Sequence, residues 1–416
     1  MKTSRKQKVF AAMSGGVDSS VSAALLKSAA TPKDFEKIFG RPTPEGFRGF
    51  EVIGVHIKMW SDPSIPCNFK EDRYDAMRAA EKIGIPFQTW DFTEEYRTAV
   101  VEYMIGEYAA GRTPNPDVMC NRHIKFGVFL RRALARGADY IATGHYARIE
   151  RVLPSSLRAQ RSNLMGLPRR SHPFTPRNDN KDSHQLLQAR DKNKDQSYFL
   201  WTLTQEQLRY CLFPIGDYTK PEVREIARNM GLPTAEKRDS QGICFIGEID
   251  LNAFLKKYIL MRPGLVRTTG GREVGTHEGL SFYTIGQRQG LGIGGGGIPY
   301  YVADKDFRTN TLTIAEGPYD EKLFTKTIPV ADVNWISGIA PKLPMRCEAR
   351  IRYRQPLQQA TIELGIKNKE LGAQNKNLLP TSYLLIRFDE PQRAATPGQS
   401  AVFYRGDEML GGGIIA

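Results

Sequence analysis

The stretch Ser14-Gly15-Gly16-Val17-Asp18-Ser19-Ser20 decides the fold, and it follows a short apolar run at residues 8–13. The apolar run predicts a buried strand, and the residues after the glycines, through about residue 27, predict a helix. Paired glycines let backbone N–H groups turn toward an anion, and the helix adds its positive N-terminus and the serine hydroxyls. The sequence therefore predicts a phosphate-binding loop between a strand and a helix.

This loop differs from the two commonest phosphate-binding motifs. It lacks the lysine of the P-loop and does not have the G-x-G-x-x-G spacing of dinucleotide-binding folds. Asp18 is unusual beside phosphates, so we expect it to reach them through Mg²⁺. The alternative is an ordinary strand-to-helix turn in which Asp18 or Ser19 caps the helix.

Strand-like and helix-like segments continue to alternate over the first third of the chain. Further strands are expected at 51–58, 85–92 and 138–143, and helices at 71–83, 93–109 and 122–136. Alternation of this kind is typical of the α/β class, with a Rossmann-like parallel sheet covered by helices on both faces.

After residue 250 the sequence pattern changes to short β-branched runs separated by glycine and proline. This pattern predicts small β-barrels or β-sandwiches. We expect a catalytic domain over 1–248, a small central β-rich domain over 249–328 and a C-terminal β-barrel over 329–416. Two stretches, at about 152–183 and 365–379, are expected to be inserted loops.

The overall composition limits the class of protein. The 416 residues carry a formal net charge of +14 and a pI near 9.5, which is compatible with a polyanionic partner such as RNA. No apolar run approaches the roughly 20 residues of a membrane span, and the N-terminus lacks a signal-peptide core, so a cytoplasmic protein is expected. The five cysteines show no CxxC pair, and the six histidines are scattered singly, so we expect neither a disulfide framework nor a protein-bound metal.

A second candidate site is Thr113-Pro114-Asn115-Pro116-Asp117-Val118-Met119-Cys120-Asn121. The prolines predict an extended loop, and Cys120 then falls near the start of a helix from Asn121, where a thiolate is stabilised. Asp117 can act as a general acid or base. The alternative for Cys120, and equally for Cys244 near residue 240, is a small buried hydrophobe.

Together these motifs resemble a known family. The loop at residues 14–19 resembles the PP-loop of the ATP pyrophosphatases, which cleave ATP between the α- and β-phosphates to adenylate a substrate. Further blocks resemble the bacterial tRNA 2-thiouridylases of the MnmA family: NPDVMCN (115–121), ATGHYAR (142–148), KDQSYFL (194–200), DSQGICFIG (239–247), FYTIGQR (282–288), RYRQ (352–355) and TPGQS (396–400). The match is ordered along the chain, and only insertions near 31–49, 152–183 and 365–379 fall outside it.

The resemblance implies a two-cysteine sulfurtransferase mechanism. Cys244 would receive a persulfide sulfur from a donor such as a cysteine desulfurase or sulfur carrier, while ATP adenylates the C2 oxygen of the wobble uridine in the Lys, Glu and Gln tRNAs. Cys120 would then be the nucleophile, either releasing hydrogen sulfide or closing a transient disulfide with Cys244. Asp117 would be the acid/base group, and the products would be 2-thiouridine, AMP and pyrophosphate.

The resemblance also carries over two sets of binding residues. Ile57 stands where the family commonly has methionine, and the alternative for His145 is a histidine satisfied by neighbouring backbone. For ATP the residues are Ala12, Met13, Ser14, Gly15, Gly16, Val17, Asp18, Ser19, Ile57 and Gly144. For the target base and tRNA they are Asn115, Pro116, Asp117, His145, Lys194, Asp195, Gln196, Arg352, Tyr353 and Gln399.

Two other functions compete with this interpretation. An amidating PP-loop synthetase would need a glutamine-hydrolysing domain or an amine site, and neither is evident. A non-catalytic RNA-binding protein would have no need for Cys120 and Cys244. Cys67, Cys211 and Cys347 match no motif, and we expect them to be structural.

Overall fold

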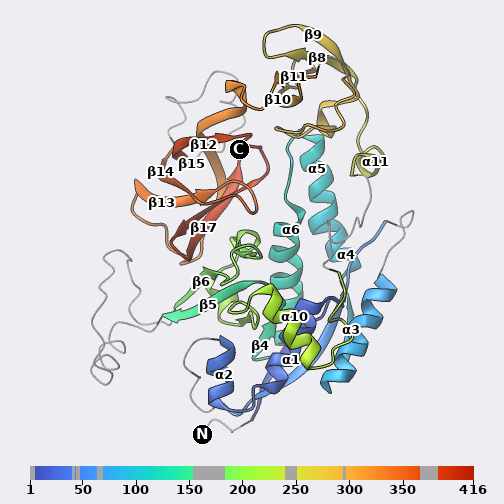
Figure 1. Cartoon of the computed structure of the whole chain (residues 1–416), viewed down its shortest axis with the longest axis vertical. Coiled ribbons are helices and arrows are strands. Elements are labelled where there is room, and N and C mark those ends of the chain that lie inside the picture. The colour runs from blue at the N-terminus through green and yellow to red at the C-terminus, as the bar shows by residue number, and fades with distance from the viewer. Residues whose placement is uncertain are drawn as a thin grey trace.

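The computed structural model describes residues 5–39, 43, 47–62, 69–152, 183–238, 251–293, 297–365 and 383–416. These residues form three β-sheets (Figure 1). The sheet that contains β1 lies at one end of the long axis, and the sheet of β8 to β11 lies at the opposite end. No helix among the described residues is long and apolar enough to cross a membrane.

The first sheet has five parallel strands in the order β3-β2-β1-β4-β7. Their bounds are β1 Gln7–Ala12, β2 Phe50–Lys58, β3 Phe87–Asp91, β4 Tyr140–Ala142 and β7 Cys211–Leu212. The chain runs outward from β1 to β3 and then returns to the other side of β1 as β4. The carboxyl ends of β1 and β4 therefore form the switch point at which open α/β sheets bind ligands.

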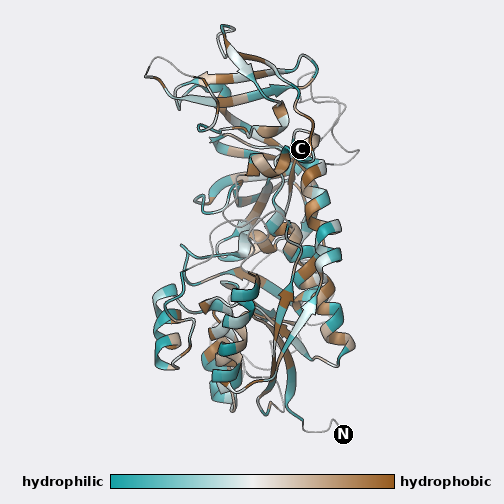
Figure 2. Cartoon of the chain, turned by 90° about the vertical axis from the view of Figure 1, so that its right-hand side faces the viewer, coloured by the Kyte–Doolittle hydropathy of each residue, from teal (hydrophilic) through white to brown (hydrophobic). Residues whose placement is uncertain are grey.

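Both faces of this sheet are buried, as the sequence predicts for a parallel sheet. Val9 and Ala11 of β1 pack into one core cluster with α1 and α3, whereas Phe10 packs on the other face with Trp90 and Phe129. Figure 2 shows that the helices carry hydrophilic and hydrophobic residues side by side, as amphipathic helices against a sheet do. The Rossmann-like prediction is confirmed.

The helices of this part are α1 Val17–Ser28, α2 Pro32–Phe39, α3 Phe69–Ile83, α4 Thr93–Tyr96, η1 Arg97–Glu102, α5 Tyr103–Ala109, α6 Pro116–Met119, η2 Cys120–Phe129, α7 Leu130–Ala135, η3 Ser197–Leu200, α9 Gln205–Leu208 and α10 Lys220–Asn229. The helix that the sequence placed from Asn121 begins earlier, at Pro116. Asn115 caps it, because its side chain accepts a hydrogen bond from the Val118 amide at 3.3 Å, and Pro116 occupies the first helical position.

The rest of the chain is β-rich. The central part contains α11 Leu251–Leu255, η4 Leu280–Phe282 and a four-stranded sheet in the order β10-β11-β8-β9. Its strands are β8 Gly264–Thr268, β9 Glu273–His277, β10 Tyr300–Asp306 and β11 Thr311–Glu316. The turn η5 Glu321–Leu323 leads into the C-terminal part.

The C-terminal strands close into a six-stranded barrel, β12-β15-β14-β13-β16-β17, because β12 also pairs with β17. The strands are β12 Phe324–Trp335, β13 Met345–Arg350, β14 Gln358–Leu364, β15 Leu384–Arg393, β16 Ser400–Arg405 and β17 Glu408–Ile415. The predicted barrel is confirmed. Strand β6 Ser183–Gln188 pairs with β5 Ala147–Val152 and also with β17, and so joins the part that contains the first sheet to the barrel.

Candidate functional site

The loop after β1 forms a compact hydrogen-bonded turn. The Ser14 amide donates to Ser19 Oγ at 3.1 Å, and the hydroxyls of Ser19 and Ser20 donate to the Gly16 carbonyl oxygen at 3.1 and 2.9 Å. Gly15 has a φ of +86°, and a Cβ there would lie 2.2 Å from the carbonyl oxygen of Asp72. The loop shape therefore requires glycine at position 15 and leaves the N-terminus of α1 facing the switch point.

Asp18 has a partner that the sequence did not indicate. Its carboxylate accepts hydrogen bonds from the Lys220 ammonium at 2.7 and 2.9 Å and from the Tyr146 hydroxyl at 2.8 Å. Lys220 is the first residue of α10, and its side chain is 10% exposed. The cation beside Asp18 in the structure is therefore an ammonium group. Among the described residues, no cluster of three His, Cys, Asp or Glu side chains could hold a metal ion.

The structure brings the expected ATP residues together at the carboxyl edge of the sheet. Gly144, which follows β4, approaches the loop so closely that a Cβ on it would lie 2.7 Å from the Ser19 amide nitrogen. Met13 continues β1, and its amide donates to the Val55 carbonyl oxygen at 2.8 Å. Ile57 lies near the end of β2, half-buried, one strand further out.

The second candidate segment connects α5 to α6 and is held by the barrel. The Thr113 amide donates to the Pro397 carbonyl oxygen at 2.8 Å. The Gln399 side-chain amide donates to the carbonyl oxygens of Thr113 and Pro114 at 2.9 and 3.1 Å. Gly398 has a φ of +92°, and a Cβ there would meet Thr113 backbone atoms at 2.8 to 2.9 Å. The side-chain amide of Gln399, which was expected to contact tRNA, thus donates its hydrogen bonds to a loop of the protein itself.

Asp117 and Cys120 follow on the short helix α6 and its continuation. Burial raises the pKa of the Asp117 carboxyl above its ordinary value, and the charge of Lys125 acts in the opposite direction. A raised pKa brings the carboxyl closer to the range in which an acid/base group can both accept and donate a proton. The direction of this shift is compatible with the expected acid/base role of Asp117, which stays a prediction.

Cys120 lies deeper in the helix than expected. It is 2% exposed and follows Met119, with its amide already bonded within the helix to the carbonyl oxygens of Pro116 and Asp117. The dipole of a helix acts mainly on its first turn, so the expectation that Cys120 sits at a helix start is wrong. Cys120 opens η2, a segment of π-type helix, a rare form that is frequent at functional sites.

The other cysteines divide into two groups. Cys244, and with it the expected transient disulfide to Cys120, lies outside the described residues, as does Cys67. Cys211 and Cys347 are buried thiols. Burial raises the pKa of Cys347 to about 12 and that of Cys211 further, so both stay protonated and unreactive near neutral pH.

Three of the expected tRNA contacts are buried: Pro116, His145 and Asp195. His145 is 7% exposed and packs between Phe126 and Phe213, its Nδ1 lies 2.7 Å from Thr143 Oγ1, and burial lowers its pKa well below the ordinary value. The ring of His145 is thus bonded to a neighbouring side chain, the Thr143 hydroxyl, and not to the neighbouring backbone of the alternative.

Asp195 is 2% exposed, and its carboxylate pairs with Arg350 of the barrel at 2.5 Å. Asp195 is therefore engaged within the protein, and its expected contact with tRNA stays a prediction.

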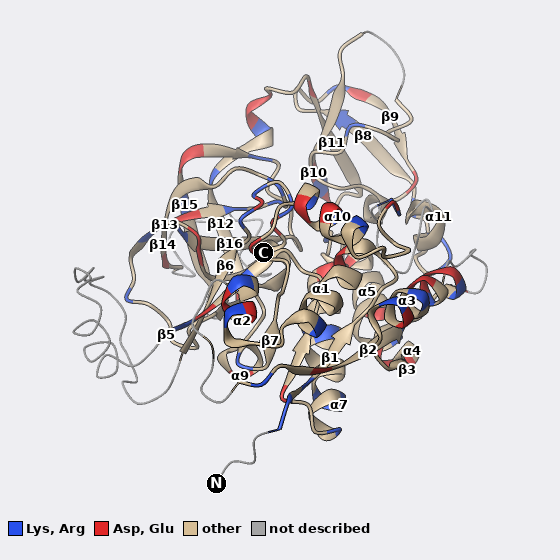
Figure 3. Ribbon diagram, turned by 60° about the horizontal axis from the view of Figure 1, so that its bottom comes forward, with Lys and Arg blue, Asp and Glu red and all other residues tan. Residues whose placement is uncertain are grey.

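The remaining expected tRNA contacts are half-buried. Gln196 Oε1 accepts a hydrogen bond from the Tyr146 amide at 3.0 Å. Arg352 donates to the Ala394 carbonyl oxygen at 2.9 Å, and the Tyr353 ring lies 4.6 Å from that of Phe199. Lys194 is also half-buried. Figure 3 shows basic and acidic residues interleaved along elements such as α3.

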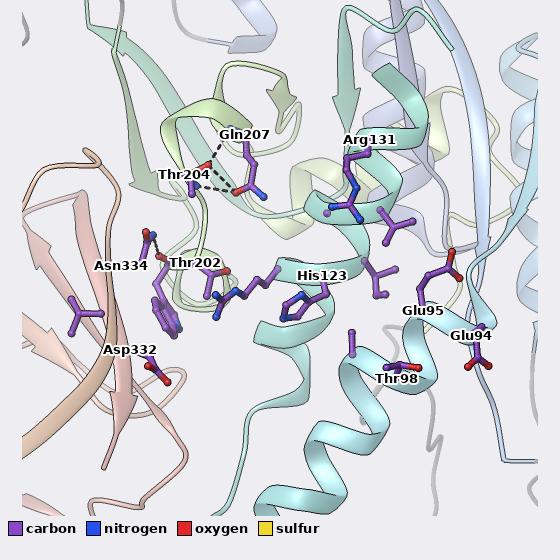
Figure 4. Close-up of a pocket in the computed structure, with 17 residues that line it drawn as sticks. Glu94, Glu95, Thr98, His123, Arg131, Thr202, Thr204, Gln207, Asp332 and Asn334 are labelled. Atoms are coloured by element: carbon purple, nitrogen blue, oxygen red, sulfur yellow. Dashed lines mark hydrogen bonds between the residues drawn. The ribbon is translucent and has the colours of Figure 1, made fainter. Parts of the chain in front are cut away.

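A cavity of about 930 Å³ lies elsewhere, between η1, η2, residues 201–207 and β12. Figure 4 shows Glu94, Glu95 and Thr98 on one wall, Thr202 and Asn334 on the opposite wall, and His123 between them. None of the residues expected for ATP or tRNA lines it.

Comparisons with known proteins cover the whole chain. Three family models match in order: the tRNA methyl transferase HUP domain over residues 7–39 and 46–248, the tRNA methyl transferase PRC-barrel domain over 252–316, and the aminomethyltransferase beta-barrel domain over 325–415.

Similar curated proteins share one name. The tRNA-specific 2-thiouridylases MnmA of Geobacillus thermodenitrificans and Streptococcus sanguinis are each 42% identical to this chain, and each comparison covers 100% of this chain and 96% of the relative. Among solved structures, the U34-tRNA thiolase NcsA from Methanococcus maripaludis matches 57% of this chain and 62% of its own, with 15% identity and a TM-score of 0.30. That likeness is too low to carry an argument.

Proposed function

The chain belongs to the MnmA family of tRNA-specific 2-thiouridylases, and on that premise we propose how its residues divide the work of an ATP-dependent tRNA sulfurtransferase. One observation carries the proposal. The phosphate-binding loop sits at the switch point of the parallel sheet in a chain that matches 2-thiouridylases along its entire length.

The first half of the reaction makes the uridine reactive. The C2 carbonyl carbon is a poor electrophile until its oxygen becomes a good leaving group. In the proposed step the C2 oxygen attacks the α-phosphorus of ATP, the bond to pyrophosphate breaks, and a C2–O–AMP group forms. The residues proposed to bind ATP are Ala12, Met13, Ser14, Gly15, Gly16, Val17, Asp18, Ser19, Ile57 and Gly144.

The contact between Asp18 and Lys220 affects how a magnesium ion would be bound. Magnesium normally accompanies ATP through phosphate oxygens and keeps several waters. Because Lys220 lies within hydrogen-bond distance of both carboxylate oxygens of Asp18, we propose that Mg²⁺ arrives with ATP and is held chiefly by the phosphates. Asp18 is then a minor ligand at most, and Lys220 balances its negative charge beside the phosphates.

The second half transfers sulfur. In one route the terminal sulfur of a Cys244 persulfide attacks C2 and AMP leaves. The Cys120 thiolate then attacks the Cys244 sulfur, which frees 2-thiouridine and leaves a Cys120–Cys244 disulfide for an external thiol to reduce. In the other route Cys120 attacks the persulfide first, and the released hydrosulfide ion attacks C2. Asp117 would move the proton in either route.

The finer assignments of substrate and setting are also proposals. We place the reaction at the wobble uridine of the Lys, Glu and Gln tRNAs in the cytoplasm, with sulfur supplied by a cysteine desulfurase or sulfur carrier. The proposed domains are 1–248, 249–328 and 329–416, which the ranges of the three family models support. Among the residues proposed to contact tRNA, the half-buried Arg352 and Tyr353 are more accessible to RNA than the buried His145 and Asp195.

The test is mass spectrometry of nucleosides from tRNA incubated with the protein, ATP, magnesium and a persulfide source. Wild type should form 2-thiouridine, and Cys120→Ser and Cys244→Ser should form none. Cys347→Ala, which changes a buried thiol of the barrel, is the matched control and should retain activity. If wild type released pyrophosphate with a different acceptor and made no thionucleoside, the amidating-synthetase alternative would replace the sulfurtransferase.

A further inference from the structure

The segment that leads to Asp117 is held from two sides by parts of the chain that are distant in sequence. On the side of the central sheet, the Lys305 ammonium of β10 donates to the carbonyl oxygens of Gly111 and Tyr283 at 2.6 and 2.7 Å. Close by, the hydroxyls of Thr113 and Thr284 lie 3.2 Å apart. The central sheet is thus bonded directly to the segment that follows α5.

The barrel holds the same segment from the other side. Gln399 donates to the Thr113 and Pro114 carbonyl oxygens, and the Pro397 carbonyl oxygen accepts from the Thr113 amide. Pro114 is followed directly by Asn115, the cap of α6, and Asp117 lies two residues beyond that cap. A displacement of Thr113 or Pro114 would therefore pass straight to Asp117 and, through α6, to Cys120.

Lys305 is an unusual lysine. Its hydrogen-bond partners are two backbone carbonyl oxygens, and no ion pair is found for it within the described part of the chain. Burial lowers the pKa of Lys305 to about 8, and only the charge of Asp304 opposes this. Partial burial of an ammonium group costs solvation energy. The two hydrogen bonds to backbone carbonyl oxygens offset part of that cost and fix the side chain at this junction.

We propose that Lys305 and Gln399 are positioning residues of the thiolation site, which clamp residues 111–114 from the central domain and the barrel and so set the geometry of Asp117 and Cys120. The assignment of these two residues to sulfur transfer rests on the proposed function; the clamp itself rests on the hydrogen bonds. Gln399 then acts on catalysis through the loop that it holds.

The clamp is tested by hydrogen–deuterium exchange on the free full-length protein, without ATP or tRNA. In Lys305→Met and in Gln399→Leu, amides of residues 113–121 should exchange about tenfold faster or more, while the strands of the first sheet keep their protection. Lys305→Arg keeps a cationic donor and should restore most of the protection. The matched control is Lys322→Met, since Lys322 is an exposed lysine of the neighbouring turn η5.

A kinetic measurement separates positioning from general stability. Both variants should lower kcat for thiolation by about tenfold and leave the KM for ATP near the wild-type value, since neither touches the loop after β1. Unchanged exchange at 113–121 in both variants, or faster exchange spread evenly over the chain, would overturn the clamp. Because exchange needs no substrate, the clamp can stand even if the thiolation assay fails, so the two failures are distinguishable.

Discussion

Lys220 Nζ lies 2.7 Å from Oδ1 and 2.9 Å from Oδ2 of Asp18, so that the first turn of α1 and the first residue of α10 are joined across 202 residues of sequence. The ammonium group is almost completely shielded, and Tyr146 donates to the same carboxylate. In this pair the ammonium balances the negative charge of Asp18, at the edge of a loop that has no lysine of its own. Without it, the Asp18 carboxylate would face an incoming polyphosphate with only a hydroxyl partner.

Lys220→Met should therefore weaken ATP binding. The replacement keeps most of the side-chain volume but leaves Asp18 charged beside the phosphates, and we expect the Kd for a non-hydrolysable ATP analogue to rise about 10- to 100-fold. Isothermal titration calorimetry measures it. Lys192→Met, which removes an exposed ion pair with Asp407 on the barrel, should leave the Kd unchanged. An unaltered Kd in Lys220→Met would remove Lys220 from the nucleotide site.

Asp117 should set the acidic limb of the pH–rate profile. Since burial raises its pKa above the ordinary 3.8, the carboxylate needed to accept a proton disappears at a higher pH than it would for an exposed aspartate. The rate of thiolation should fall as the pH drops through that raised pKa. The stability contribution runs in the opposite direction: the folded state binds the proton more tightly than the unfolded state, so ionisation of Asp117 destabilises the fold as the pH rises through this window.

The effect of Lys125 on the pKa of Asp117 allows the position of the acidic limb to be tested. Its charge lowers the pKa of Asp117 against the effect of burial, so Lys125→Met should move the acidic limb to higher pH. Arg122→Met removes an exposed cation from the same helix and serves as the control. If the acidic limb of the pH–rate profile does not move in Lys125→Met, or if it persists in Asp117→Asn, a group other than Asp117 is responsible for it.

The sequence predicted those parts of the site whose residues lie close together along the chain. The loop at 14–20 with the strand before it and the segment at 113–121 are local patterns, and glycine and proline mark them. The start of α6 was missed, although the Asn115-Pro116 pair is itself a signature of a cap followed by a first-turn proline.

Partners that meet only through the tertiary fold could not be predicted. Lys220, Lys305 and Arg350 are ordinary basic residues in the sequence, and each gains its role from a group more than 150 residues away in the chain or from carbonyl oxygens of another domain. The same holds for Gln399, whose bonds to Thr113 and Pro114 join residues more than 280 positions apart in the chain.

Gly144 should not tolerate a side chain. A Cβ there would come within 2.7 Å of the Ser19 amide nitrogen, so Gly144→Ala must push apart the loop after β4 and the first turn of α1. We expect a destabilisation of about 1–3 kcal/mol in urea denaturation together with at least about tenfold weaker ATP-analogue binding. Gly106→Ala is the matched control, because a Cβ on this helical glycine meets nothing within 4 Å, and it should be neutral or slightly stabilising.

The variant Asp195→Asn distinguishes a role of Asp195 in stability from a role in RNA binding. Asp195 and Arg350 form a pair with side chains 1% and 6% exposed, joined by the Tyr404 hydroxyl, at the junction between the catalytic part and the barrel. Removing the carboxylate charge leaves a buried guanidinium uncompensated, and a broken pair of this kind costs about 3–5 kcal/mol. The free energy of unfolding in urea should fall by an amount of that order.

The affinity of the folded variant for tRNA decides between the two roles of Asp195. A buried carboxylate makes no contact with RNA, so Asp195→Asn should bind tRNA as wild type does under conditions in which it remains folded. Asp407→Asn, which alters an exposed carboxylate paired with Lys192 and Arg148, controls for the loss of a negative charge and should cost little stability. Weakened tRNA binding without a loss of stability in Asp195→Asn would instead require the junction to open when RNA binds, because only then could this carboxylate reach it.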